Sequence, residues 1–341
     1  MCVGAVISTA SFGPQWGLGQ FVVGRVVSGL GNGMDTATIP VWQSEASQAK
    51  NRGLLVCLEG AVIAVGTFIA YWLDFGFSYI DSSVQWRFPV AFQIFFAVIM
   101  SLGMWGLPES PRWLIAHNYE NEAREVLSAL YDVPSGDESV ETTIKLVQAD
   151  LLHAGQSKFT DIFTNGKKQH LQRTLLGAST QFWQQFTGCN AAIYYSTLLF
   201  QNTIGLERRL SLILGGVFAT VYMFATIPSF FMIERVGRRK LFLIGFLGQG
   251  LAFLITFGCL INPTEANARG AAVGLYLFII FFAFTLLPLP WIYPPEINPL
   301  QTRTAAASVS TCTNWICNFA VVMFTPVFAQ TSSWGTFCTQ D

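Results

Sequence analysis

Long apolar stretches separated by short polar turns make up most of this chain. A helix needs about 20 residues to cross about 30 Å of hydrocarbon. Stretches of this length occur at 18–41, 54–73, 88–107, 174–200, 210–233, 241–262, 271–293 and 305–329. Residues 1–13 are also apolar but too few to span. The pattern therefore predicts an all-α membrane protein with eight full spans and one shorter segment.

One long polar segment, 109–173, interrupts this pattern. It contains ENEAREVLSALYDV, which has helical periodicity, followed by the turn signal VPSGD. We expect a cytosolic linker with short helices here. The linker separates an N-terminal bundle over 1–108 from a C-terminal bundle over 174–341.

Composition excludes several classes of protein. Charged residues make up 11% of the chain, less than half of the roughly 25% usual in soluble proteins. A net charge of −1 gives no field for nucleic acid. The seven Cys have no zinc-ligand spacing, and all three His lie in the polar segment without a nucleophile or metal partner. We therefore expect that the protein is not an enzyme, that it binds no cofactor or metal, and that it is embedded in a lipid bilayer.

Basic residues set the expected orientation. With segment 109–173 inside, 14 Lys and Arg are cytoplasmic, four are external and Arg25 lies within a span. The four external ones are Arg87, Arg208, Arg209 and Arg269. This excess agrees with the positive-inside rule.

One charge pattern occurs twice. Glu45 precedes Arg52 as Glu296 precedes Arg303, at an offset of 251 residues and at the predicted cytoplasmic end of a span in both cases. The recurrence favours parallel repeats related about the membrane normal, as in two-bundle transporters.

Several segments resemble a known family closely. They are Gly24-Arg25 with the glycine-rich stretch after it, PVWQSEASQAKNRG (40–53), PESPRWL (108–114), QQFTGCNAAIYYS (184–196), ERVGRRKL (234–241) and PWIYPPEI (290–297). Together they resemble the sugar porter family of the major facilitator superfamily. Within it, LEGAVIAVGTFIAYWLDFGFSY (58–79), VQWRFPVAFQ (84–93) and TCTNWICNFAVVMFTP (311–326) look most like the fungal glycerol–proton symporters.

The resemblance implies a major facilitator fold of two six-helix bundles. Against that pattern, the chain matches the third to eleventh helices, about nine of twelve, and TSSWGTFCTQD at its end is too short and polar for a twelfth span. It also implies secondary active import of glycerol, or a similar small polyol, with protons, at the plasma membrane. The sequence does not indicate an oligomeric state, and we expect a monomer. An uncoupled hexose or polyol facilitator and a non-transporting nutrient sensor are the alternatives.

Three charged residues lie within spans, where each costs about 3 kcal/mol at a helix centre and therefore tends to face a cavity or partner. They are the proton-coupling candidates Arg25, Asp35 and Glu59. By resemblance, Arg25 pairs with a proton-accepting aspartate of the first helix; alternatively it reaches the lipid headgroups. Asp35 lines the cavity or bonds another helix. Glu59 faces the cavity or joins the cytoplasmic charges.

Amides and aromatics indicate a neutral, hydroxylated substrate, because an amide both donates and accepts. Gln184 or Gln185 shares a helix face with Asn190 if the helix unwinds at Gly188. The resemblance implies that these three residues contact substrate and that Trp291 forms the floor. The candidate set is Gln184, Gln185, Asn190, Tyr195, Trp291, Asn314 and Asn318. Interhelical hydrogen bonding is the alternative role.

Three positions depart from the hexose carriers that the chain resembles. Gly60, Tyr222 and Ala283 stand where those carriers have Gln, Asn and Glu. A hexose would leave hydroxyls unpaired at about 1–3 kcal/mol each. Glycerol, with fewer hydroxyls, needs fewer partners.

Charges at the cytoplasmic ends form a candidate gate, as the resemblance implies. They are Glu45, Arg52, Glu109, Arg112, Glu234, Arg238, Arg239, Glu296 and Arg303. For Arg235 and Lys240 we expect membrane anchoring instead.

Two local patterns also predict helix geometry. Gly29-x-x-x-Gly33 is a helix-packing pattern, and Pro288 and Pro290 should break the span 271–293 where it lines a cavity.

Overall fold

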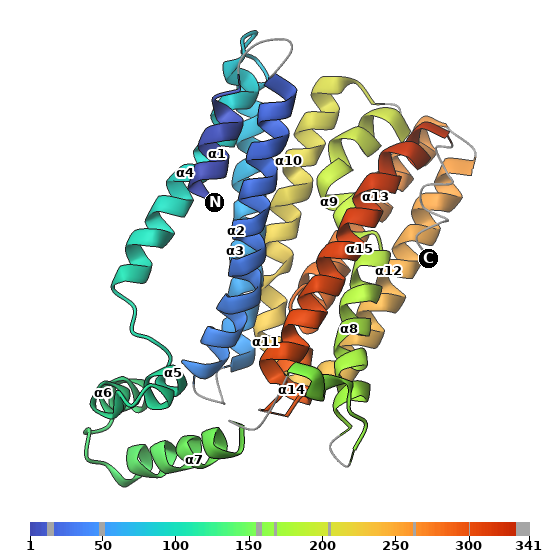
Figure 1. Ribbon diagram of the computed structural model, residues 1–341. Helices are drawn as coiled ribbons and strands as arrows, with labels where there is room; N and C mark the ends of the chain where they lie inside the picture. The colour runs from blue at the N-terminus through green and yellow to red at the C-terminus, as the bar shows by residue number, and fades with distance from the viewer. Residues whose placement is uncertain are drawn as a thin grey trace. The chain divides into compact units, whose positions relative to one another are not determined.

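The computed structural model describes residues 1–11, 17–47, 52–154, 159–166, 169–203, 206–261, 264–299 and 301–331. Within these ranges the chain forms helices and no strand (Figure 1), so the prediction of an all-α protein is confirmed. The chain divides into two compact units. One comprises Met1–Arg52 and Gly76–Ser157, and the other Gly53–Phe75 and Lys158–Asp341.

Six helices of the described residues are long and apolar enough to cross a membrane. They are Gly53–Phe77, Val84–Trp105, Arg208–Val236, Arg238–Ile261, Ala266–Ile297 and Arg303–Val327. The predicted spans 18–41 and 174–200 are also helical but are not among the six. The first carries Arg25, Asp35 and several glycines, and the second is broken near Gly188.

In the first unit, α1 (Cys2–Thr9) packs against α2 (Gly17–Glu45) and α4 (Val84–Trp105). A Cβ on Gly24 would lie 2.6 Å from the Ser8 amide nitrogen and 2.7 Å from the Gly4 carbonyl. The two backbones therefore approach closely because both residues lack a side chain. The predicted Gly29–Gly33 packing is not seen, since nothing described lies within 4 Å of a Cβ at either position. The buried face of α2 includes Gly24 instead.

Gly24→Ala should destabilise the protein, whereas Gly29→Ala should not. The added methyl at position 24 meets backbone atoms of α1 that cannot move aside, and such overpacking typically costs about 1–3 kcal/mol. At position 29 the methyl meets open space and improves helix propensity. Melting temperatures of the two detergent-solubilised variants test this. Equal melting temperatures would contradict the close α1–α2 packing.

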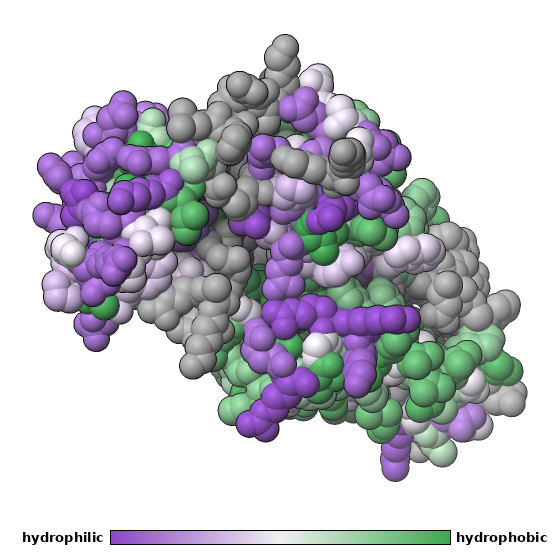
Figure 2. All heavy atoms as spheres, turned by 90° about the horizontal axis from the view of Figure 1, so that it is seen from below, coloured by the Kyte–Doolittle hydropathy of each residue, from purple (hydrophilic) through white to green (hydrophobic). Residues whose placement is uncertain are grey.

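Three short helices follow α4, as predicted for the polar segment: α5 (Pro111–Ala116), α6 (Glu120–Tyr131) and α7 (Glu138–Ala154). Hydrophilic side chains gather over them in Figure 2. Their own small core includes Leu114, Leu127 and Ile144. Arg124 on α6 also binds Glu141 on α7 at 2.7 Å. This linker therefore has packing of its own.

The second unit contains most of α3 and the helices after the linker. They are α3 (Arg52–Phe77), η1 (Phe159–Phe163), α8 (His170–Phe186), α9 (Cys189–Leu198), η2 (Leu199–Thr203), α10 (Arg208–Ala225), α11 (Ile227–Val236), α12 (Arg238–Ile261), α13 (Glu265–Phe281), η3 (Phe282–Leu286), α14 (Leu289–Ile297) and α15 (Arg303–Thr331). Although α3 belongs to the predicted N-terminal bundle, residues 53–75 pack with this unit. The boundaries at 108 and 174 stay predictions.

Two predicted helix breaks are confirmed. Gly188, between α8 and α9, has a φ of 76°, a left-handed conformation that glycine adopts without steric cost. The span 271–293 changes to the π-helix η3 and then breaks at 287–288 before Pro290. Both breaks lie beside the candidate substrate residues. The main apolar core adjoins both, since it includes Cys189 after the first break and Leu286 and Leu287 at the second.

Candidate substrate site and cytoplasmic ion cluster

Helix α8 buries three glutamines on one face. Gln181, Gln184 and Gln185 are 1%, 3% and 4% exposed. Their spacing of three and four residues places them side by side on a helix. Sequence reasoning identified Gln184 and Gln185 but missed Gln181.

Two of these glutamines bind backbone carbonyls that prolines leave without a donor. In a continuous helix, the carbonyl of Leu286 accepts from residue 290 and that of Pro290 accepts from residue 294. Both donors are prolines, which have no N–H. Gln184 Nε2 donates to the Leu286 carbonyl at 2.7 Å, and Gln181 Nε2 donates to the Pro290 carbonyl at 2.8 Å. The glutamines of α8 thus supply the hydrogen bonds that the broken helix lacks.

Asn314 on α15 completes this network. Its Nδ2 donates to Gln181 Oε1 at 2.6 Å and to Gln184 Oε1 at 3.2 Å. Asn314 is 3% exposed. Both glutamine amides are therefore used at their oxygen and their nitrogen, which fixes their orientation.

Gln185 and Asn190 form a second amide pair. Asn190 Nδ2 donates to Gln185 Oε1 at 2.6 Å, across the break at Gly188, so the prediction that unwinding brings these residues together is confirmed. Among the described residues, Gln185 Nε2 has no hydrogen-bond partner. This pair therefore keeps donor and acceptor capacity that the Gln181–Gln184–Asn314 network has used.

The other candidate substrate residues come from neighbouring helices of the same unit. The Tyr195 hydroxyl donates to the Val322 carbonyl on α15 at 3.2 Å. Trp291 on α14 follows Pro290 directly and packs beside Leu289 and Ile292. Asn318, one turn after Asn314, is buried, and its Oδ1 has no hydrogen-bond partner in the described chain.

The three proton-coupling candidates differ in their surroundings. Arg25 on α2 is exposed and Asp35 is half-buried, and neither forms an ion pair with a described residue. Glu59 on α3, in the second unit, buries its Oε2 without a hydrogen-bond partner among the residues described. A buried carboxylate without a partner is costly while charged, and protonation removes that cost.

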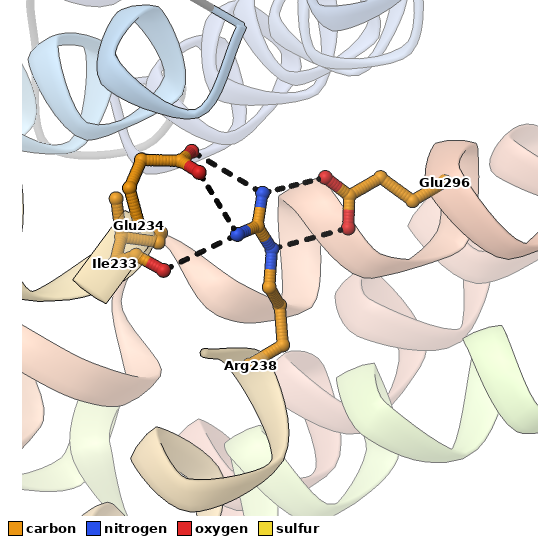
Figure 3. Close-up of polar contacts among 4 residues, drawn as sticks. All are labelled: Ile233, Glu234, Arg238 and Glu296. Atoms are coloured by element: carbon orange, nitrogen blue, oxygen red, sulfur yellow. Dashed lines mark hydrogen bonds and ion pairs between the residues drawn. The ribbon is translucent and has the colours of Figure 1, made fainter. Parts of the chain in front are cut away.

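Arg238 is the centre of an ion cluster at the predicted cytoplasmic end (Figure 3). Its Nη2 and Nε donate to the two oxygens of Glu296 at 2.9 and 3.3 Å. Its Nη1 and Nη2 donate to the oxygens of Glu234 at 3.3 Å each, and Nη1 also donates to the Ile233 carbonyl at 3.2 Å. All five N–H groups of the guanidinium are thereby matched. The cluster joins α11, α12 and α14.

Helix α3 also reaches this cluster. A Cβ on Gly53 would lie 2.3 Å from Glu234 Oε1, so the carboxylate lies against the first turn of α3, close to the positive end of the helix dipole. Two carboxylates share one guanidinium here, and the helix end stabilises the remaining negative charge. Only glycine leaves room for this approach.

The remaining gate candidates are distributed as follows. In the first unit, Glu45 accepts a hydrogen bond from the Ser110 hydroxyl at 2.7 Å, and Glu109 is exposed. Arg239 is exposed, unlike its neighbour Arg238. Arg112 and Arg303 both have interaction partners. The side chain of Arg52 lies outside the described residues.

Comparison with solved structures identifies the class of fold. The chain superposes on the structure of the "MFS (major facilitator superfamily) proton:xylose symporter XylE bound to 6-bromo-6-deoxy-D-glucose" with a TM-score of 0.84 and 21% identity, covering 99% of this chain and 75% of that one. A partially occluded inward-open structure of XylE from E. coli matches with a TM-score of 0.78. The predicted major facilitator fold is confirmed.

Sequence comparison identifies the family. Residues 1–340 match the family model described as "Sugar (and other) transporter". The chain belongs to this family of multi-pass membrane transporters, which is not a family of enzymes.

Two fungal relatives are similar over almost the whole chain. The "Major facilitator superfamily transporter mfsA" of Aspergillus fumigatus is 63% identical over 339 residues, 99% of this chain and 62% of that protein. The "Sugar transporter STL1" of Saccharomyces cerevisiae is 58% identical over 337 residues, 98% of this chain and 59% of that protein. The chain thus spans about three fifths of the length of these relatives.

Proposed function

We propose that this protein imports glycerol, or a similar small polyol, together with protons across the plasma membrane by alternating access. The observation that carries the proposal is the Gln185–Asn190 amide pair beside two helix breaks. An amide pair suits a hydroxyl, which must both donate and accept a hydrogen bond. Broken helices at membrane depth are tolerated where they line a cavity.

Packing around the site supports a substrate smaller than a hexose. Tyr222 and Ala283 are 2% and 0% exposed and belong to the main apolar core. A Cβ on Gly60 would lie 3.2 Å from the side chain of Leu287 in that core. Gly60, Tyr222 and Ala283 thus supply none of the amide or carboxylate groups that the hexose carriers have at these positions, and they are packed in an apolar core. A three-carbon polyol needs fewer partners than a hexose.

Proton coupling is proposed for Arg25, Asp35 and Glu59. Glu59 has the strongest structural support because one of its carboxyl oxygens is buried without a partner in the described chain. Such a group binds a proton when it is enclosed and releases it when water reaches it. The ion cluster around Arg238 is the proposed cytoplasmic gate, which opens when its ion pairs separate.

Glycerol-triggered proton uptake tests the proposal. The tagged chain is expressed in yeast that lack their own glycerol transporters, and the external pH is recorded after glycerol is added at acidic pH. Alkalinisation that a protonophore abolishes supports symport. Glycerol uptake without a pH change would indicate a facilitator instead. A protein that reaches the membrane but gives neither signal would contradict transport of glycerol.

Gln185→Ala should weaken glycerol uptake without lowering the amount of protein at the cell surface. The substitution removes the acceptor of Asn190 and a free amide donor. The loss of one such group typically costs about 0.5–1.5 kcal/mol, which raises the half-saturation concentration about two- to twelvefold. Gln172→Ala is the matched control, since Gln172 is exposed on the same helix. Unchanged uptake by Gln185→Ala would remove this residue from the site.

A further inference from the structure

Helix α9 carries Asn190 and Tyr195, yet neither of its ends continues as regular helix. Gly188 breaks the chain before it, and the π-helix η2 follows it directly. The orientation of such a short helix depends on the side chains that contact its flanks. On one flank, the Tyr195 hydroxyl binds α15.

Tyr71 of α3 binds the other flank of α9. Its hydroxyl donates to the Ile193 carbonyl and lies 2.8 Å from the Ser196 hydroxyl. Ser196 is 1% exposed, so both contacts lie inside the protein. Ile193 is one turn after Asn190, and Ser196 is one turn further.

Helix α10 also packs against this contact between α3 and α9. A Cβ on Gly215 would lie 2.6 Å from Thr197 Oγ1 on α9 and 3.2 Å from the Tyr71 ring. This glycine lets α3, α9 and α10 meet at one point. The neighbouring Trp72 binds α10 rather than α9, since its Nε1 donates to Thr220 Oγ1 at 3.0 Å.

From these contacts we infer that Tyr71 is a positioning residue for the substrate site: its hydroxyl fixes α9 and thereby holds Asn190 against Gln185. The inference rests on the proposed function for the identity of the substrate. The hydrogen bonds of the Tyr71 hydroxyl in the described chain go to Ile193 and Ser196, not to Asn190. It acts through the backbone of α9, which carries Asn190 at its first turn.

The native Cys189 provides a direct test. It is the first residue of α9, is 1% exposed, and its thiol contacts the Gln184 carbonyl at 3.3 Å. Release of α9 should expose this thiol. Labelling by N-ethylmaleimide in membranes is measured by mass spectrometry of the peptide that contains Cys189, so the other cysteines do not interfere.

Tyr71→Phe keeps the ring against Gly215 and removes only the hydroxyl. We expect Cys189 to be labelled about fivefold faster or more, the factor that corresponds to loss of at least one hydrogen bond of average strength. Trp72→Phe, the adjacent residue on the same helix, also loses one hydrogen bond but to α10, and should leave the rate unchanged. A wild-type labelling rate in Tyr71→Phe, or an equal rise in Trp72→Phe, would overturn the inference.

Ser196→Ala adds a second, independent measurement. It should raise the labelling rate less than Tyr71→Phe does, and it should add nothing in the Tyr71→Phe background because both changes remove the same contact. Full additivity would contradict a shared contact. In uptake, Tyr71→Phe should raise the half-saturation concentration more than it lowers the maximal rate. Labelling does not require glycerol to be the substrate, so failure of the proposed function and failure of this inference are distinguishable.

Discussion

Arg238→Ala is expected to lower glycerol uptake at least tenfold, while Arg239→Ala leaves it near the wild-type value. Arg238 donates four of its N–H groups to Glu234 and Glu296, which lie on two other helices, and the fifth to the Ile233 carbonyl. Its removal leaves two carboxylates near one another without a cation. Two like charges about 4 Å apart repel by about 1 kcal/mol in bulk water and by about 4 kcal/mol near a protein surface. A cost within this range is sufficient for a tenfold effect.

Arg239 is the matched control because it is the next residue, has the same charge and is exposed. Isolated exposed charges contribute about 0–1 kcal/mol. Arg238→Lys should be intermediate, since an ammonium cannot bind two carboxylates with a planar fork. Adding Glu296→Gln to Arg238→Ala should restore part of the uptake by removing one of the repelling charges. Equal losses in Arg238→Ala and Arg239→Ala would show that only the net positive charge matters.

Local sequence patterns predicted the features that depend on a few neighbouring residues. The length of the apolar stretches predicted the long helices. Gly188 predicted the break between α8 and α9, and Pro288 with Pro290 predicted the break before α14. The Gln185–Asn190 contact followed from the same reasoning, because the two residues are five positions apart. In each case the physical cause lies within one or two helical turns.

Features that depend on which helices become neighbours were not predictable in this way. Gln181 was missed because its partners, Pro290 and Asn314, are 109 and 133 residues away. The glycines of α2 show the same limit, since composition alone does not tell which face meets α1. Likewise, Glu296 and Arg303 were linked by a repeat, whereas the structure shows Arg238, 58 residues away, bound to Glu296.

Gln181 nevertheless left a signal in the sequence. Pro290 and Pro294 stand four apart, so the carbonyls of Leu286 and Pro290 both lose their helical donors. Two amides on one helix face, spaced three apart, are suited to replace them. Proline pairs in a membrane helix therefore indicate where a neighbouring helix must supply side-chain donors.

Asn314→Leu should lower the melting temperature of the detergent-solubilised protein by about 5–10 °C, because each oxygen left buried and unpaired costs about 1–3 kcal/mol. Asn314 donates to two buried acceptors, Gln181 Oε1 and Gln184 Oε1. Leucine has nearly the same shape but donates no hydrogen bond. With their oxygens released, the two glutamine amides lose their fixed orientation toward the carbonyls of the broken helix. Uptake should fall together with stability.

Asn318→Leu is the matched control for stability, since Asn318 lies one turn further along α15 and its Oδ1 is already buried without a partner among the described residues. Its melting temperature should stay within about 2 °C of the wild type, because removal of one buried unsatisfied oxygen offsets loss of the hydrogen bond between the Asn318 and Tyr194 side chains. The pair of variants also separates the two roles considered for these asparagines. A loss of uptake in Asn318→Leu at an unchanged melting temperature would indicate substrate contact. Equal destabilisation by both variants would contradict the network assigned to Asn314, because Asn314, unlike Asn318, donates to the two α8 glutamines that bind the carbonyls left free by the prolines.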